Sequence, residues 1–424
     1  MKLESIALHH GYESESTTKA ATTPIYQTSS FTFDNTQHGA DLFNLKVEGN
    51  IYSRIMNPTN AVLEQRLAEM EGGIASLSLA SGMAAITAAI QCITRTGDNI
   101  VSTSQLYGGT YNLFAHSFPQ QGINVRLVDA NNLEALDNAF DDNTKALYCE
   151  TIGNPLGNIV DIEALAEIAH KHGVPLVVDN TVATPYLCKP IEHGADIIIH
   201  SLTKYIGGHG TTIGGAIIDS GKFDWAKDKK KFPMLNEPDP SYHGVVYTEA
   251  LGPAAYIGRC RVVPLRNTGA ALSPHSAFQI MQGLETLGLR MERHCSNAET
   301  VANYLQDHEQ VEWVNYATLK NDKYFDLCKK TTAGLASGII SFGIKGGVEA
   351  GTKFIDALQM ILRLVNIGDA KSLACHPAST THRQLNPSEL KAAGVSEEMI
   401  RISVGIEHVD DIIADISQAL DAAK

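Results

Sequence analysis

Short apolar runs alternate with helical patterns along residues 61–218 of this 424-residue chain. The apolar runs predict strands at 74–79, 99–103, 123–128, 144–149, 175–179, 195–200 and 213–218. Helical spacing between them predicts helices at 61–70, 109–120, 131–140 and 161–172, and a further helix that follows Met83 and ends at Thr94. Strands that are almost wholly apolar are buried on both faces, so the pattern predicts an α/β fold with a mostly parallel sheet covered by helices on each side.

Three other segments break this alternation. Residues 1–60 are rich in Ser, Thr and aromatic side chains without a helical period, so they predict an arm that lies across the large domain or a neighbouring subunit. Residues 222–265, which contain several prolines, predict a long irregular insertion. Residues 266–424 predict a smaller α+β domain with one long helix to about residue 308 and several strands, one of them near 364–367. This leaves 61–265 as the large domain.

Composition restricts the partners and the compartment. With 33 Lys plus Arg against 47 Asp plus Glu, the net charge is −14, which argues against nucleic acid and against an anionic membrane as partners. The seven cysteines are dispersed without a C-x-x-C pair, and neither they nor the histidines have metal-site spacing. Free thiols fit a reducing compartment, and neither a signal peptide nor a membrane-length apolar run is visible, so we expect a cytoplasmic protein without a metal.

Lys204 is the first candidate functional residue. It follows the predicted strand 195–200, in a loop of hydroxyl and glycine residues that runs from Ser201 to Gly210. Open α/β sheets bind their ligands just beyond the carboxyl ends of their strands. A lysine there either holds a phosphate as a point charge or forms a Schiff base with a carbonyl cofactor; the alternative is a surface lysine in a flexible loop.

Three more features fall at ends of predicted strands. Ser81-Gly82-Met83 opens a helix, and a helix start with free amides favours phosphate. Asp179 closes an apolar strand, where an acid is costly to bury without a partner. Tyr107 offers an aromatic face. Taken singly, each also has an ordinary explanation as a helix start, a turn residue or a core side chain.

Together these features match the parts of pyridoxal 5′-phosphate (PLP). Lys204 suits the aldehyde, Asp179 the ring nitrogen and Tyr107 a flat ring face. The predicted phosphate contacts are Ser81, Gly82, Met83, Ser201 and Thr203. A dinucleotide is excluded because no G-x-G-x-x-G follows the first strand, and the glycine run at 207–210 fits neither that pattern nor a P-loop.

A set of motifs along the whole chain carries a family resemblance. They are Tyr52-Ser-Arg54, Ser81-Gly-Met83, Asp179-Asn-Thr181, Ser201-Leu-Thr-Lys-Tyr205, the segment from Ser372 to His382, and Arg401-Ile-Ser-Val-Gly405. On these, the chain resembles the Cys/Met-metabolism family of PLP enzymes, which includes cystathionine synthases and lyases, methionine γ-lyase and O-acetylhomoserine sulfhydrylase. The resemblance implies an aspartate-aminotransferase-like fold (fold type I) and a homotetramer built as a dimer of dimers.

The resemblance also implies roles around the cofactor. Tyr52 and Arg54 would reach the phosphate of a neighbouring subunit's PLP, which would account for the arm. Asn154 would contact the phenolic oxygen of PLP or the substrate carboxylate. Lys204 would move protons during catalysis, with Tyr107 and the partner subunit's Tyr52 as helpers.

Substrate binding is expected at two further positions. An amino-acid substrate has a carboxylate, and the planar guanidinium of Arg401 suits a bidentate grip on it. Ser372 is the expected second carboxylate contact, together with Asn154.

Details of the chain favour one branch of this family. Methionine γ-lyases usually carry a cysteine two residues after the active-site tyrosine, where this chain has Gly109, and the cystathionine-forming branches lack a long insertion like 222–265. The segments Leu106–Phe114 and Ala378–Leu385 also resemble O-acetylhomoserine sulfhydrylases. We therefore expect γ-replacement in methionine biosynthesis: O-acetyl-L-homoserine and sulfide give L-homocysteine and acetate. The alternatives are a γ- or β-elimination lyase of methionine, cystathionine or cysteine, or a cystathionine γ-synthase. The sulfur donor stays open among sulfide, methanethiol and a sulfur-carrier protein, and the leaving group stays open among acetyl, succinyl and phospho.

Overall fold

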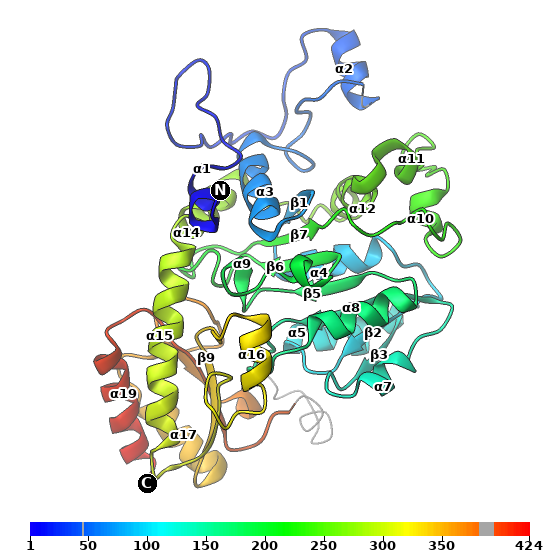
Figure 1. Ribbon diagram of the computed structural model, residues 1–424. Helices are drawn as coiled ribbons and strands as arrows, with labels where there is room; N and C mark the ends of the chain where they lie inside the picture. Colours follow the sequence, from blue (N-terminus) through cyan, green and yellow to red (C-terminus); the bar gives the residue numbers. More distant parts are fainter. Residues whose placement is uncertain (45, 381–393) are drawn as a thin grey trace.

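The computed structural model describes residues 1–44, 46–380 and 394–424. Its centre is a seven-stranded sheet in the order β1-β7-β6-β5-β4-β2-β3 (Figure 1). Only β7 is antiparallel to its neighbours within this sheet, so the predicted mostly parallel α/β fold is confirmed. The strands are β1 Ala75–Leu79, β2 Asn99–Thr103, β3 Asn124–Val128, β4 Thr144–Glu150, β5 Leu176–Asp179, β6 Ile197–Ser201 and β7 Gly215–Asp219.

Helices cover both faces of this sheet because alternate strand residues feed two separate cores. On β5 and β6, Val177 and Ile199 pack on the face of α4 (Gly82–Gln91), whereas Val178 and Ile198 pack on the face of α3 (Pro58–Glu71). Successive side chains of a strand point to opposite faces, so a strand buried on both sides is apolar throughout. The other helices of this part are α5 Gly108–Asn112, α6 Phe118–Gln120, α7 Leu133–Asp137, α8 Ile162–Lys171 and α9 Thr184–Leu187.

A second, smaller sheet in the order β10-β11-β12-β9-β8 forms the C-terminal α+β part, as predicted. Its strands are β8 Val311–Asn315, β9 Ile339–Ile344, β10 Leu362–Arg363, β11 Leu373–Cys375 and β12 Met399–Ser403. Its helices are α14 Pro274–Leu284, α15 Leu287–Gln306, α16 Phe325–Thr331, α17 Gly347–Ala357 and α19 Val409–Ala422. The single long helix expected to about residue 308 is interrupted between α14 and α15. The strand predicted at 364–367 is wrong, since that apolar segment is a loop between β10 and β11.

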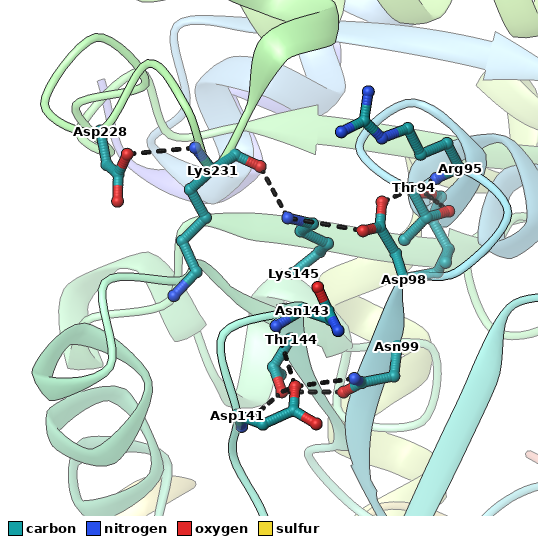
Figure 2. A network of polar contacts seen from close by, with 11 residues as sticks. Thr94, Arg95, Asp98, Asn99, Asp141, Asn143, Thr144, Lys145, Asp228 and Lys231 are labelled. Atoms are coloured by element: carbon teal, nitrogen blue, oxygen red, sulfur yellow. Dashed lines mark hydrogen bonds and ion pairs between the residues drawn. The ribbon is translucent and has the colours of Figure 1, made fainter.

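The insertion at 222–265 is more helical than predicted. Besides α10 (Pro233–Asn236), residues 247–268 form a chain of short helices: α11 Tyr247–Leu251, α12 Ala255–Cys260, a π-helical turn Arg261–Leu265 and α13 Arg266–Thr268. Figure 2 shows how its first part is held: the buried Lys145 of β4 donates to the carbonyl oxygen of Lys231 at 2.9 Å and lies 3.5 Å from the Asp98 carboxylate. A buried lysine needs partners for its charge, and Lys145 finds one of them in the backbone of the insertion. This contact fixes the insertion at the amino end of β4.

The N-terminal arm projects from the body of the chain. After α1 (Leu3–His9), the arm leads to α2 (Thr36–Phe43), which lies away from the central sheet (Figure 1). Several of its apolar side chains are exposed, among them Ile25, Phe33 and Phe43. Exposed apolar side chains gathered on one segment favour a contact with another surface. Among the described residues, no helix has the length and hydropathy that a bilayer crossing requires.

Candidate active site

A cavity of about 230 Å³ opens at the carboxyl ends of β4, β5 and β6. It brings together the predicted residues Ser81, Gly82, Met83, Tyr107, Asn154, Asp179, Ser201, Thr203 and Lys204. The rest of its lining comprises Ile86, Glu150, Ile152, Thr181, Val182, Ile213, Val365 and Ile367. The strand-end position predicted from the sequence is therefore where the candidate residues meet.

The start of α4 forms one end of the cavity. The Ser81 hydroxyl accepts a hydrogen bond from the Ala84 amide at 3.1 Å, which leaves the amides of Gly82 and Met83 for a ligand. A Cβ atom on Gly82 would come within 2.7 Å of the Ser201 Cβ, so only glycine lets the helix start approach β6 this closely. Free amides and the positive end of the helix dipole together favour a phosphate.

Asp179 lies in the wall of the cavity beside a second acid. Its carboxylate accepts hydrogen bonds from the Thr181 amide at 3.0 Å and the Tyr148 hydroxyl at 3.3 Å. Burial raises the pKa of Asp179, and the Thr181 hydrogen bonds oppose this rise. Glu150 pairs in register with Asp179, and burial followed by the charge of Asp179 raises the pKa of Glu150 well above its usual range. Because adjacent buried carboxyls do not both ionise, Glu150 is the neutral one and Asp179 carries the charge.

Lys204 reaches into the cavity from the loop after β6. Its amine donates a hydrogen bond to the side-chain oxygen of Asn366. Burial, and then the charge of Arg401, lowers the pKa of Lys204 to about 8. A lysine with so low a pKa is partly neutral near physiological pH, which is the form that attacks a carbonyl carbon.

Arg401 of β12 lies under the rim of the cavity and is 3% exposed. One guanidinium nitrogen donates to the Asn154 side chain at 3.0 Å, and the other donates to the carbonyl oxygens of Val365 and Asn366 at 3.3 and 3.2 Å. Its Nε has no hydrogen-bond partner within the described ranges. Since no carboxylate of the described residues pairs with Arg401, this buried cation has the chemistry to bind the carboxylate of a ligand.

Ser372, just before β11, hydrogen-bonds to residues of the C-terminal part of the chain. Its hydroxyl donates to Glu407 at 2.9 Å and accepts from the Gly405 amide at 2.8 Å, and its own amide donates to Glu407 at 2.6 Å. These three hydrogen bonds hold the segment before β11 in place and leave no polar group of Ser372 in the cavity lining. The second carboxylate contact expected at Ser372 stays a prediction, and the polar residue that lies beside Arg401 and Lys204 is Asn366.

The two predicted arm residues lie outside this chain's own cavity. Tyr52 is half-exposed, and the Arg54 guanidinium lies 5.4 Å from the centre of its ring. This placement is the one expected if both residues serve a neighbouring subunit. The end of the Ser372–His382 motif and residues 381–385 of the Ala378–Leu385 segment fall outside the described residues.

Two polar residues that contact the predicted residues, Glu150 in the cavity lining and Asn366 beside Lys204, were missed from the sequence. Glu150 closes an apolar strand as Asp179 does, so the same signal would have found it had the predicted strand not ended at residue 149. It accepts a hydrogen bond from the Tyr107 amide at 2.7 Å and thus fixes the backbone of the predicted stacking residue. Asn366 has no local signal, because it reaches Lys204 only through the packing of the 364–367 loop.

Comparison with known proteins identifies the family. The family model described as "Cys/Met metabolism PLP-dependent enzyme" matches residues 4–421. The chain belongs to this family. An O-acetyl-L-homoserine sulfhydrylase of Leptospira meyeri is 51% identical over 428 residues, covering 99% of this chain and 96% of that protein. A homocysteine synthase of Schizosaccharomyces pombe is 50% identical over 421 residues, with 99% and 98% covered.

A solved structure of similar sequence has the same fold as this chain. The crystal structure of a putative O-acetylhomoserine (thiol)-lyase from Campylobacter jejuni matches with a TM-score of 0.97 at 43% identity, over 99% of this chain and 100% of that chain. It contains N′-pyridoxyl-lysine-5′-monophosphate. The predicted family, the fold-type-I architecture and the PLP cofactor are thus confirmed. The cavity fits PLP, because it combines a free helix start, a buried carboxylate and a lysine of lowered pKa.

Proposed function

We propose that this chain is a PLP-dependent O-acetylhomoserine sulfhydrylase, an aminocarboxypropyl transferase of methionine biosynthesis. It converts O-acetyl-L-homoserine and sulfide into L-homocysteine and acetate. The observation that carries this proposal is end-to-end similarity, at 50–51% identity, to a protein named O-acetyl-L-homoserine sulfhydrylase and to one named homocysteine synthase. The cavity supports it with a reactive lysine beside an arginine that suits the substrate carboxylate.

The residues that would hold PLP follow from the cavity. The amides of Gly82 and Met83 and the hydroxyls of Ser201 and Thr203 bind the phosphate. Tyr107 covers one ring face. When bound, PLP supplies an electron sink for the negative charge that develops on the substrate.

Asp179 and Lys204 are the residues that hold and transfer protons in the proposed reaction. The ionised Asp179 keeps a proton on the ring nitrogen, which makes the ring a better electron acceptor. The Lys204 amine, with a pKa of about 8, takes a proton from the substrate Cα and returns it later. Proton transfer by a positioned group typically contributes about 10²–10⁴-fold to the rate. Across the reaction, the Cγ–O bond to acetate breaks and a Cγ–S bond forms. Tyr107 and the partner subunit's Tyr52 are the proposed helpers at Cγ.

Substrate selection is assigned to the rim of the cavity. Arg401 binds the α-carboxylate, held in place by Asn154 and by the backbone of Asn366. The exposed apolar side chains of Ile213 and Val365 border the cavity. An apolar rim has no charge to pair with a second amino-acid head group, which favours sulfide over cysteine as the nucleophile.

The assembly is part of the proposal. Tyr52 and Arg54 reach the phosphate of the neighbouring subunit's PLP, which places the exposed apolar side chains of the arm against that subunit. The enzyme is a homotetramer with the arm at 1–60, the large domain at 61–265 and the small domain at 266–424. We place it in the cytoplasm, as the composition suggests, and a sulfur-carrier protein enters only as an alternative sulfur donor to be tested.

Product analysis tests this function. Purified enzyme is supplied with O-acetyl-, O-succinyl- or O-phospho-L-homoserine and with sulfide, methanethiol or cysteine, and products are followed by proton NMR. The proposal predicts homocysteine and acetate in equal amounts from O-acetyl-L-homoserine and sulfide. Dominant 2-ketobutyrate and ammonia without any sulfur donor would show a lyase instead, and cystathionine as the main product with cysteine would show a cystathionine γ-synthase.

A further inference from the structure

A buried histidine–glutamate pair lies behind the active site, on the other face of the central sheet. His200 precedes Ser201 on β6, and successive side chains of a strand point to opposite faces. Ser201 borders the cavity, so His200 points to the face covered by α3. There its Nε2 lies 2.5 Å from a carboxylate oxygen of Glu71, the last residue of α3, and both side chains are fully buried.

Glu71 also holds the neighbouring strand end. The Asn180 amide group donates to the same Glu71 oxygen at 2.9 Å and to the Cys188 carbonyl at 2.9 Å, while its oxygen accepts from the Thr151 hydroxyl at 2.9 Å. Asn180 directly follows Asp179. One carboxylate therefore ties together the ends of β5 and β6, whose adjacent residues Asp179 and Ser201 face the cavity.

Apart from Asn180, the Glu71–His200 pair has few polar neighbours. Among the described residues, neither the second Glu71 oxygen nor His200 Nδ1 has a hydrogen-bond partner. A fully buried carboxylate without a partner is costly, and the imidazole of His200 is its partner at contact distance. His200 also lies close to Asp179 across the sheet, because Ile199, the residue before His200, pairs in register with Asp179. Burial raises the pKa of Asp179, and the Thr181 hydrogen bonds and then a positive charge on His200 oppose that rise.

We propose that Glu71 and His200 form a charged dyad that positions the active site from the far face of the sheet. Glu71 fixes Asn180 and His200, and the His200 cation helps to keep Asp179 ionised so that the ring nitrogen of PLP stays protonated. Both are positioning residues, since neither borders the cavity. The inference depends on the PLP cofactor of the family and not on which amino acid is the substrate.

The test compares Glu71→Gln and His200→Gln with His170→Gln. His170 of α8 lies 2.8 Å from the carboxylate of Asp196, which directly precedes β6 at the end opposite to His200. This control therefore removes a histidine–carboxylate pair without changing the cavity. Each apoenzyme is loaded with ring-¹⁵N-labelled PLP. The readouts are the ¹⁵N resonance of the ring, the dissociation constant of PLP and the thermal unfolding temperature of the apoenzyme.

The dyad variants should move the ¹⁵N resonance from the protonated position toward the neutral one and raise the PLP dissociation constant about 10-fold, which is the equivalent of one pKa unit. His170→Gln should change neither quantity. Lower unfolding temperatures with an unmoved ¹⁵N resonance would overturn the proposal, because a merely structural pair has that effect. An equal ¹⁵N change in His170→Gln would also overturn it. Glu71→Gln keeps the volume and hydrogen bonding of the site, so it decides the question alone if His200→Gln does not fold.

Discussion

Replacing Arg401 with lysine tests how the substrate carboxylate is bound. Lysine keeps the positive charge, but it cannot donate at once to Asn154, to the two backbone carbonyls and to a carboxylate. A hydrogen bond to a charged group contributes about 1.5–3 kcal/mol. Losing one bond to the substrate should therefore lower kcat/KM for O-acetyl-L-homoserine about 10- to 100-fold, mainly through KM. The assay is steady-state formation of homocysteine with saturating sulfide.

The cofactor provides the internal check for Arg401→Lys. Arg401 is not one of the proposed PLP contacts, so the absorbance and the dissociation constant of PLP should stay at their wild-type values. The matched control is Arg259→Lys, which changes another buried arginine, one that donates to the Cys92 carbonyl at 2.6 Å. It should alter stability but not KM. If kcat/KM of Arg401→Lys stays within about twofold of wild type, Arg401 does not bind the substrate carboxylate.

Three more outcomes follow from the cavity. The neutral Lys204 amine predominates above a pKa of about 8, so the rate of covalent PLP capture by the apoenzyme should rise with pH through about 8 and then level off; a midpoint near 10 would contradict the effect of burial. Gly82→Ala would place a Cβ within 2.7 Å of the Ser201 Cβ, and we expect at least a tenfold loss of PLP affinity in equilibrium binding, whereas unchanged affinity would refute the close-approach argument. Ser372→Ala should lower the free energy of unfolding by about 1.5–3 kcal/mol in urea titration but leave KM within about twofold, because its hydroxyl serves Glu407; a large rise in KM would support its predicted role.

Much of the fold could be predicted because the strands are buried on both faces. A run such as Ile197–Ile199 is apolar at every position, and its residues feed both cores in turn, which differs clearly from the spacing of a surface helix. The helices of 247–268 were missed because glycine and proline interrupt their pattern. The 364–367 loop was mistaken for a strand because it is apolar, but its apolar side chains serve the cavity and not a sheet. Its Val365 and Ile367 border the cavity.

The candidate site was predictable where chemistry and strand ends coincide. Lys204 and Asp179 each stand out as a polar residue after an apolar run, and the sheet then brings them together. Asn366 and the His200–Glu71 dyad could not be found in this way, since their partners are distant in sequence and depend on packing between helix, loop and sheet. At Ser372 the motif identifies a polar residue but not the direction of its side chain, which donates to Glu407.

The central claim is that Lys204 anchors PLP. Reducing the holoenzyme with borohydride and mapping the modified peptide by mass spectrometry tests it most directly. The structure predicts a single pyridoxyl-phosphate adduct on Lys204, because its buried amine of low pKa lies in the cavity with Asp179 and the start of α4. An adduct on a different lysine, or no adduct in a holoenzyme that retains PLP absorbance, would contradict it.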